Sequence, residues 1–407
     1  MKIRSITYFF NPGWPLDEKA LKKAGDFTAR ARLDFQAAGF EVQMTRLASV
    51  PFPYLVPSLE VSQVVHLAQE LEQAAKAQGF DYAAIGPALP EFPQSYRVIP
   101  EVIAATRDIF ACGVMAGGAG VIYLPAVRAC AEVIQRTMPL EPGGFANLRF
   151  GAIANMPPGG PFLPAAYHAG ESPAFALAIE AGDLAVQAVT PAASLAEARQ
   201  SLIGALEQNT QRMAGVAHKL ELEMGVRFGG FDCSLAPFPE IEMSFGTAME
   251  RLGLPAVGLH GSLAAAAFFA DALDRAQFPR AGFNGLMMPV LEDATLALRS
   301  EQGVLTVKDL LLYSAVCGAG LDTVPLPGDT SAGQIAAVLL DVAALAQRLN
   351  KPLIARLMPI PGKAAGDPTG FDFAFFAPGR VLGLQAQPLS GLLAGEETFD
   401  LQPRRSR

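Results

Sequence analysis

The alternation of strand-like and helix-like segments is the feature of this sequence that most limits its fold. Residues 3–10 alternate apolar and polar side chains as a strand does and end at Asn11-Pro12-Gly13; a helical pattern over residues 18–38 ends at Gly39. Further strand-like runs lie at residues 40–47, 82–86, 110–115, 149–155, 175–180, 184–189, 228–233, 256–260, 285–288, 353–358 and 380–384. Such alternation favours parallel βαβ units, in an open doubly wound sheet or in a closed barrel.

Composition limits the class of protein and its partners. Hydrophobic residues make up 51% of the 407 residues and charged residues 17%, which is typical of a globular chain. The net charge of −8, with no Lys/Arg run before the C-terminal tail, argues against nucleic-acid binding and against an anionic membrane surface. The longest apolar run, residues 263–273, is interrupted by Asp271 and is too short to span a bilayer, so we expect no membrane contact.

The composition stays even along the chain to about residue 395, and this bears on the domain organisation. We expect one domain over residues 1–395, or two packed lobes over 1–150 and 151–395, followed by a short basic tail over 396–407. Four cysteines without metal-ligand spacing do not form a disulfide framework, and the N-terminus lacks a signal-peptide cleavage site. A cytoplasmic protein is the simplest interpretation.

The segment FGGFDCSLAPFPEIEMS, residues 228–244, is the first candidate site. If residues 228–231 form a buried strand, Asp232 and Ser234 emerge near its carboxyl end, where α/β proteins place their ligands. Asp232, with Glu240 or Glu242, then offers oxygen ligands for a divalent cation or a polar substrate, and Ser244 follows. The alternative is that Asp232 caps a turn and that the glutamates are solvated.

Two later motifs combine a charged residue with a helix start. In GLHGS, Gly261 and Ser262 offer backbone N–H groups and a hydroxyl to an anion, and His260 could act as acid, base or ligand. The alternative is an ordinary Ser cap with a buried, hydrogen-bonded His. In PVLEDA, adjacent Glu292 and Asp293 cannot face the same way, so one can face a site while the other caps a helix beginning near Ala294. Alternatively, both are helix acids favoured by the dipole.

Three further motifs carry charged or aromatic residues. Arg356 lies within an apolar strand pattern and needs a carboxylate or anion partner, while Lys363 follows a Pro-Gly turn; a structural salt bridge is the alternative. Asp322 lies in an apolar setting. Tyr167 and His168, on a loop rich in Pro and Gly, are either catalytic or part of a packed lid.

These segments, in this order, resemble the signature blocks of a known family, domain of unknown function 711, also called uncharacterised protein family 0210. The blocks are FDCSLAPFPEIEMS, GLHGS, PVLEDA, CGAGLDTVPLPGDT and RLMPIPGKAAGD, and FLPAAYHAGES is similar to a further one; the resemblance covers about residues 155–373. The matching residues are His168, Glu171, Asp232, Ser234, Pro237, Ser244, His260, Gly261, Glu292, Asp293, Cys317, Asp322, Asp329, Arg356, Lys363 and Asp367. The family's Asp-Ser pair stands here as Met243-Ser244, so one acid is missing.

The resemblance implies a fold and brings glycyl radical chemistry into consideration. It implies the ten-stranded β/α barrel of glycyl radical enzymes such as pyruvate formate-lyase, although fold alone does not imply chemistry. The radical motif R-V-x-G followed by an aromatic residue stands here as Arg380-Val381-Leu382-Gly383-Leu384, without the aromatic. Cys317 is the cysteine that would have to lie near Gly383. Radical chemistry is therefore the third functional hypothesis.

The leading hypothesis is an enzyme acting on a small polar or anionic metabolite at one barrel mouth. His260, His168, Asp232 and Glu292 are the catalytic candidates, and Asp232, Glu292 and Asp293 are the candidate ligands of Mg²⁺, Mn²⁺ or Ca²⁺. The candidate substrate-binding residues are Ser234, Ser244, Gly261, Ser262, Arg356 and Lys363. The second hypothesis is a non-catalytic protein that binds a small molecule in the same pocket. A homo-oligomer is compatible with either.

Overall fold

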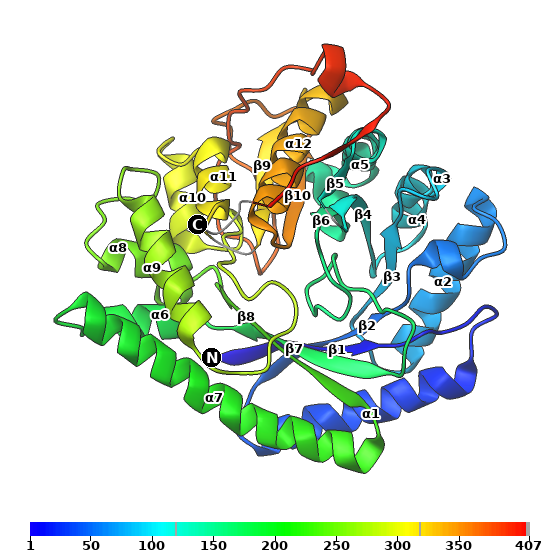
Figure 1. The fold of residues 1–407 in the computed structure, drawn as a ribbon, viewed down its shortest axis with the longest axis horizontal. Coiled ribbons are helices and arrows are strands. Elements are labelled where there is room, and N and C mark those ends of the chain that lie inside the picture. The colour runs from blue at the N-terminus through cyan, green and yellow to red at the C-terminus, as the bar shows by residue number, and fades with distance from the viewer. Residues whose placement is uncertain (119, 317–318, 404–407) are drawn as a thin grey trace.

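The computed structural model describes residues 1–118, 120–316 and 319–403. Eleven strands form one sheet that curves around an interior, and the helices lie outside it (Figure 1). The strands are β1 (Lys2–Phe9), β2 (Val42–Ala48), β3 (Tyr82–Ala88), β4 (Ile109–Gly117), β5 (Val121–Tyr123), β6 (Phe150–Ala154), β7 (Ala174–Glu180), β8 (Arg227–Ala236), β9 (Gly320–Pro327), β10 (Leu353–Ile360) and β11 (Thr398–Asp400).

The helices connect successive strands and cover the outer face of the sheet. They are α1 (Glu18–Ala37), α2 (Val61–Ala77), α3 (Gln94–Arg97), α4 (Ile99–Ala105), α5 (Leu124–Thr137), α6 (Gly182–Val189), α7 (Leu195–Met224), α8 (Phe245–Arg251), α9 (Ser262–Arg275), α10 (Ala294–Glu301), α11 (Val307–Ser314) and α12 (Ala332–Leu349). Short 3₁₀ helices are η1 (Phe52–Tyr54), η2 (Met138–Leu140), η3 (Pro142–Arg149), η4 (Ile241–Met243) and η5 (Gly391–Ala394).

Helix α7 shows how local sequence defines an element. Ser194 caps its start by accepting a hydrogen bond from Glu197 N at 3.2 Å, and Gly225 ends it at φ 68°, a left-handed conformation that glycine adopts without steric cost. Leu202, Leu206 and Met213 belong to the apolar stripe of the helix and are buried. By contrast, the strand predicted over 184–189 is part of helix α6, because a short apolar run fits either period.

The sheet is mixed rather than wholly parallel, which corrects the expectation of parallel βαβ units throughout. Its order is β8-β7-β1-β2-β3-β4-β6-β10-β9, with β5 and β11 added beside β4. Strands β1, β2, β3, β4 and β6 are parallel, whereas β7 pairs antiparallel with β1 and β10 pairs antiparallel with β6. The reversals follow from the connection between β6 and β7, residues 155–173, which contains no helix to return the chain in parallel.

The sheet is not closed, and the segment over residues 279–290 lies between its two edges. Within the described residues this segment forms no regular strand, although a strand-like run was predicted at 285–288. The run predicted at 256–260, before α9, forms no regular strand either. It contacts β8 through Phe231 N to Pro279 O at 2.9 Å and β9 through Val290 N to Asp322 O at 3.2 Å. A Cβ at Gly230 would lie 2.9 Å from the Arg280 backbone, so glycine permits this approach.

The loop over residues 155–173 enters the space that the sheet surrounds (Figure 1). Thr7 Oγ1 donates to Pro161 O at 3.2 Å, and His168 N donates to Ser49 O at 2.9 Å. These bonds attach the loop to β1 and to the segment after β2. The loop therefore places Phe162 and Leu163 in the interior.

Two other elements bear on the sequence predictions. Helix α12 is long and apolar enough to cross a membrane by length and composition alone, and half of it is buried inside the protein, as in the core helix of a globular domain. Strand β11 lies within the predicted tail and pairs with β5. Residues 404–407 of that tail, and Cys317, lie outside the described residues.

Candidate functional site

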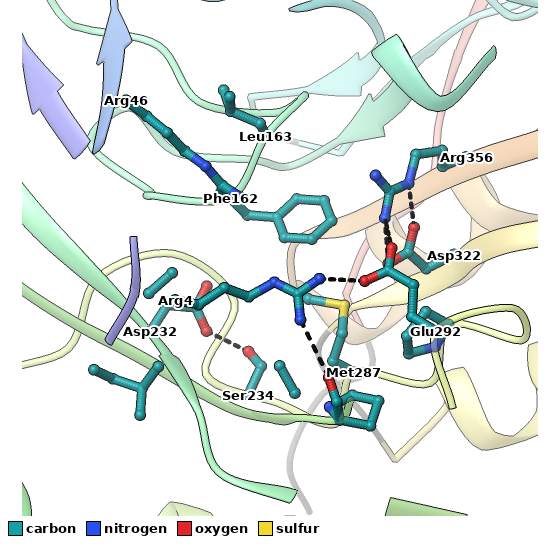
Figure 2. Close-up of a pocket in the computed structure, with 15 residues that line it drawn as sticks. Arg4, Arg46, Phe162, Leu163, Asp232, Ser234, Met287, Glu292, Asp322 and Arg356 are labelled. Atoms are coloured by element: carbon teal, nitrogen blue, oxygen red, sulfur yellow. Dashed lines mark hydrogen bonds and ion pairs between the residues drawn. The ribbon is translucent and has the colours of Figure 1, made fainter. Parts of the chain in front are cut away.

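An interior cavity of about 60 Å³ gathers charged side chains from distant parts of the chain (Figure 2). Strands β1 and β2 contribute Arg4 and Arg46, and Phe162 comes from the interior loop. The other polar side chains that line the cavity come from β8, β9, β10 and the segment before α10: Asp232, Ser234, Asp322, Arg356 and Glu292. The sequence predicts that Asp232, His260, Glu292 and Arg356 share one barrel mouth. Asp232, Glu292 and Arg356 line this cavity, and His260 does not.

Arg4, Glu292, Arg356 and Asp322 form a continuous arginine–carboxylate chain. Arg356 donates to both oxygens of Asp322, at 2.6 and 3.0 Å, and to Glu292 Oε1 at 2.9 Å. The other oxygen of Glu292 accepts from Arg4, whose second nitrogen donates to Pro237 O at 3.1 Å. The predicted partner of the buried Arg356 is therefore a pair of carboxylates, and this bidentate geometry is the strong form of such contacts.

The arginine–carboxylate chain is electrostatically stable because positive and negative groups alternate along it. Burial alone would lower the pKa of Arg356, but the carboxylates of Asp322 and Glu292 raise it above its ordinary 12.5. The ring of Phe162 lies over the same guanidinium, 5.4 Å from its central carbon to the ring centroid. Arg356 thus stays charged, and its charge is already balanced by protein groups.

Among the described residues, Arg46 is the cation of the cavity that contacts no carboxylate. It is 8% exposed, and its Nε has no hydrogen-bond partner. Its remaining nitrogens make long contacts to Pro161 O at 3.4 Å and to the Met44 sulfur at 3.6 Å. Burial, and then the charge of Arg4, lower the pKa of Arg46 from 12.5 to about 9. A buried guanidinium in this state lacks the counter-charge that it needs.

Asp232 combines a cavity position with the turn-stabilising role given as its alternative. Its carboxylate accepts from Phe283 N at 2.9 Å, from Asn284 N at 3.2 Å and from the Ser234 hydroxyl. Burial raises its pKa, although these hydrogen bonds oppose the rise. Asp232 therefore holds residues 283–284 against β8 while it lines the cavity.

Glu292 and Asp293 divide their roles as one of the two sequence interpretations predicted. Glu292 faces the cavity, whereas Asp293 caps α10 by accepting from Thr295 N and Leu296 N. Asp293 also accepts from the Ser244 hydroxyl at 2.6 Å, and Ser244 caps α8 through Thr247 N. Asp293 and Ser244 thus link the starts of α10 and α8. Neither residue lines the cavity, although Asp293 was predicted to bind a metal and Ser244 a substrate.

Two of the three predicted metal ligands, Asp232 and Glu292, line the cavity, and the third, Asp293, does not. Within the described residues, no group of three His, Cys, Asp or Glu side chains is arranged to hold a metal ion. Asp293 is engaged by helix N–H groups, while both oxygens of Glu292 contact arginines. Binding of Mg²⁺, Mn²⁺ or Ca²⁺ stays a prediction of the sequence without a preformed ligand set.

The remaining predicted residues lie elsewhere. His260 is exposed and precedes α9; Gly261 caps that helix, and the Ser262 hydroxyl donates to Leu259 O at 2.7 Å. Lys363 is half-buried in the turn after β10. His168 is buried and lines a separate pocket of about 400 Å³ beside Asn11 and Val50; its Nε2 donates to Glu171 O at 3.0 Å.

The sequence analysis missed Arg4 and Arg46, which lie in the first fifth of the chain. A signal existed, because each is a charged residue inside a strand-like alternating run that is otherwise largely apolar. Asp322, noted for its apolar setting, proves to be the bidentate partner of Arg356.

Taken together, the fold and the cavity define a mixed α/β protein with a buried cluster of charged residues. The chain belongs to the family described as Uncharacterised ACR (DUF711), whose sequence profile matches residues 1–373 and so extends the resemblance to the first strand. A UPF0210 protein of Pyrobaculum islandicum is 33% identical over 344 residues, covering 81% of this chain and 76% of that protein. The UPF0210 protein NMC1568 of Neisseria meningitidis is 30% identical over 362 residues, covering 85% and 80%.

Proposed function

We propose that the interior cavity binds a small anionic metabolite and that Arg46 supplies the counter-charge. The observation that carries this proposal is a guanidinium that is nine-tenths buried, lines a cavity and has no carboxylate contact. A buried charge without a partner costs several kcal/mol, and an anionic ligand would remove that cost. Arg4 and Arg356, the other arginines of the cavity, already contact Glu292. Their interaction with the ligand would therefore be weaker than that of Arg46.

We further propose that the protein is an enzyme in which Asp232 moves a proton. Burial raises the pKa of Asp232, which favours a carboxyl group able to hold and release a proton, and the Ser234 hydroxyl lies beside it. The second candidate, a protein that binds the anion without turnover, is favoured by the lack of any histidine among the described residues of the cavity. Glycyl-radical chemistry ranks third, since Gly383 lines a different pocket, beside Lys308 and Gly366.

The proposal includes a fold assignment and a cellular setting. The segment over residues 279–290 would take the place of a tenth strand and close a barrel like that of pyruvate formate-lyase, because it hydrogen-bonds to both β8 and β9. The partner would be a small molecule rather than a nucleic acid or a membrane, in keeping with the net charge of −8. We propose a cytoplasmic protein, which could form a homo-oligomer.

Calorimetric titration with acetate and inorganic phosphate tests the binding site. We expect at least one of these anions to bind wild type, and Arg46→Met to weaken that binding at least 30-fold, since the loss of a buried charge partner costs about 2 kcal/mol or more. Arg97→Met is the matched control, because Arg97 is exposed on α3. Binding that Arg46→Met leaves unchanged would refute the proposal.

A second measurement separates the enzyme from the binder. Wild type and Asp232→Asn are compared for turnover across small carboxylic acids, amino acids and phosphorylated metabolites. We expect Asp232→Asn to keep anion affinity within a few fold and to lose turnover. If neither protein turns over any compound that binds, the non-catalytic alternative replaces the enzyme.

A further inference from the structure

The size of the cavity limits how much of a ligand it can enclose. At about 60 Å³ it is less than half the size of the ~150 Å³ engineered cavity that accepts benzene. Such a space accepts a carboxylate or a similar charged group, but not the rest of a metabolite. Whatever lies attached to that charged group must extend into another part of the protein.

A second hollow, which we call the aromatic pocket, lies at the amino-terminal ends of β3 and β4. Its volume is about 460 Å³, within the range of about 300–1,000 Å³ typical of small-molecule sites. Tyr82 packs edge-to-face on Phe110 at 5.3 Å between ring centroids, and Phe145 packs similarly on Phe373 at 5.1 Å. These four rings and Leu148 give the pocket an apolar lining.

Residues that line the aromatic pocket are neighbours of residues that line the cavity. Arg46 and Tyr82 are paired neighbours on the parallel strands β2 and β3, so their side chains project from the same face of the sheet. Leu163, which lines the cavity, packs in one apolar cluster with Phe110 and Tyr82, which line the pocket. The unpaired guanidinium of Arg46 therefore lies next to the aromatic pocket.

Four charged residues line the aromatic pocket. Arg149, Glu141 and Asp108 have ion-pair partners, and Arg107 is exposed to solvent. Arg149 donates to Glu141 at 2.6 Å and to the carbonyl oxygens of Thr106 and Ile103 at 2.9 Å each, while Asp108 pairs with Lys76. Arg46 thus stands out among the buried cations in contact with either hollow, because it alone of Arg4, Arg46, Arg149 and Arg356 has no carboxylate contact. A ligand with an anionic group and an apolar body would pair with Arg46 and fill the aromatic pocket at the same time.

We propose that the ligand of this protein is a carboxylate carrying an aromatic or branched apolar body. Its carboxylate would pair with Arg46, and its body would lie against Tyr82, Phe110 and Phe373. This inference rests on the proposed anion site and adds the class of compound. It predicts selectivity for amphipathic acids over small hydrophilic ones, because apolar surface leaves water only when the aromatic pocket is filled.

Calorimetric titration of the full chain with acetate and phenylacetate tests this inference. A phenyl group adds six heavy atoms, and at about 0.3 kcal/mol per atom we expect phenylacetate to bind about 20-fold more tightly than acetate. Phe373→Ala should remove most of that preference while it leaves acetate affinity unchanged. Phe373 is half-buried, so its truncation leaves the fully buried core intact; Leu148→Ala provides a second variant with the same expectation.

The outcomes distinguish this inference from the proposal on which it rests. If acetate binds in an Arg46-dependent way but phenylacetate binds no more tightly, the amphipathic ligand is wrong and the anion site stands. The same conclusion follows if both Phe373→Ala and Leu148→Ala keep the full preference. If neither carboxylate binds, or if Arg46→Met binds both as wild type does, the anion site itself fails.

Discussion

Replacing Arg46 by Met should stabilise the ligand-free protein. A pKa lowered from 12.5 to about 9 corresponds to about 5 kcal/mol of unfavourable free energy for the charged guanidinium at neutral pH. Met keeps much of the apolar stem and removes the charge, at the cost of two long contacts to Pro161 O and the Met44 sulfur that are worth about 1 kcal/mol or less each. We expect the free energy of unfolding to rise by about 1–4 kcal/mol.

The pH dependence of this gain follows from the direction of the pKa shift. Because burial lowers the pKa of Arg46, the folded chain releases this proton at a lower pH than the unfolded chain does, so wild type becomes more stable relative to the variant as the pH rises above about 9. The advantage of Arg46→Met is therefore full below pH 9 and should shrink by about 1 kcal/mol at pH 10. Unfolding in urea at pH 7 and pH 10, in a buffer with weakly binding anions, measures both values.

The result has a clear refutation and a matched control. Arg97→Met changes the same residue type on an exposed surface and should shift stability by about 0.5 kcal/mol or less. If Arg46→Met lowers the free energy of unfolding by more than about 1 kcal/mol, Arg46 is a structural residue whose contacts satisfy its charge. If Arg46→Met is the more stable protein, as we expect, a saturating anion should reverse the order, since it stabilises wild type by mass action and leaves the variant unchanged.

Two further predictions concern the other buried charges. Glu292→Gln should lower the free energy of unfolding by about 3 kcal/mol in urea, because Arg4 and Arg356 both lose a carboxylate; a loss below about 1 kcal/mol would contradict the pairing. Burial raises the pKa of Glu180 above its ordinary 4.5, despite Arg4 and Gln43, so its ionised form costs stability as pH rises through and above 4.5. Glu180→Gln should therefore gain stability relative to wild type between pH 4 and pH 7, and a difference that falls over that interval would show the opposite sign.

The sequence by itself determined the elements and several local contacts. The alternation of periods identified an α/β chain, and Gly225 marked the end of α7, because periodicity and capping are properties of neighbouring residues. The adjacent acids Glu292 and Asp293 could be assigned opposite faces for the same reason. The family was also recognisable from short blocks, and the matched region extends over residues 1–373.

Tertiary structure alone decided how the strands join and which charges meet. The reversals at β7 and β10 depend on the helix-free loop between β6 and β7, and no local pattern states which strand a chain segment will pair with. Arg4 reaches Glu292 across 288 residues of sequence, and Asp232 finds its backbone donors about 50 residues later. Burial of a charge is set by packing between such distant segments. The sequence could therefore suggest the acids, while only the folded chain showed that Arg46 contacts no carboxylate among the described residues.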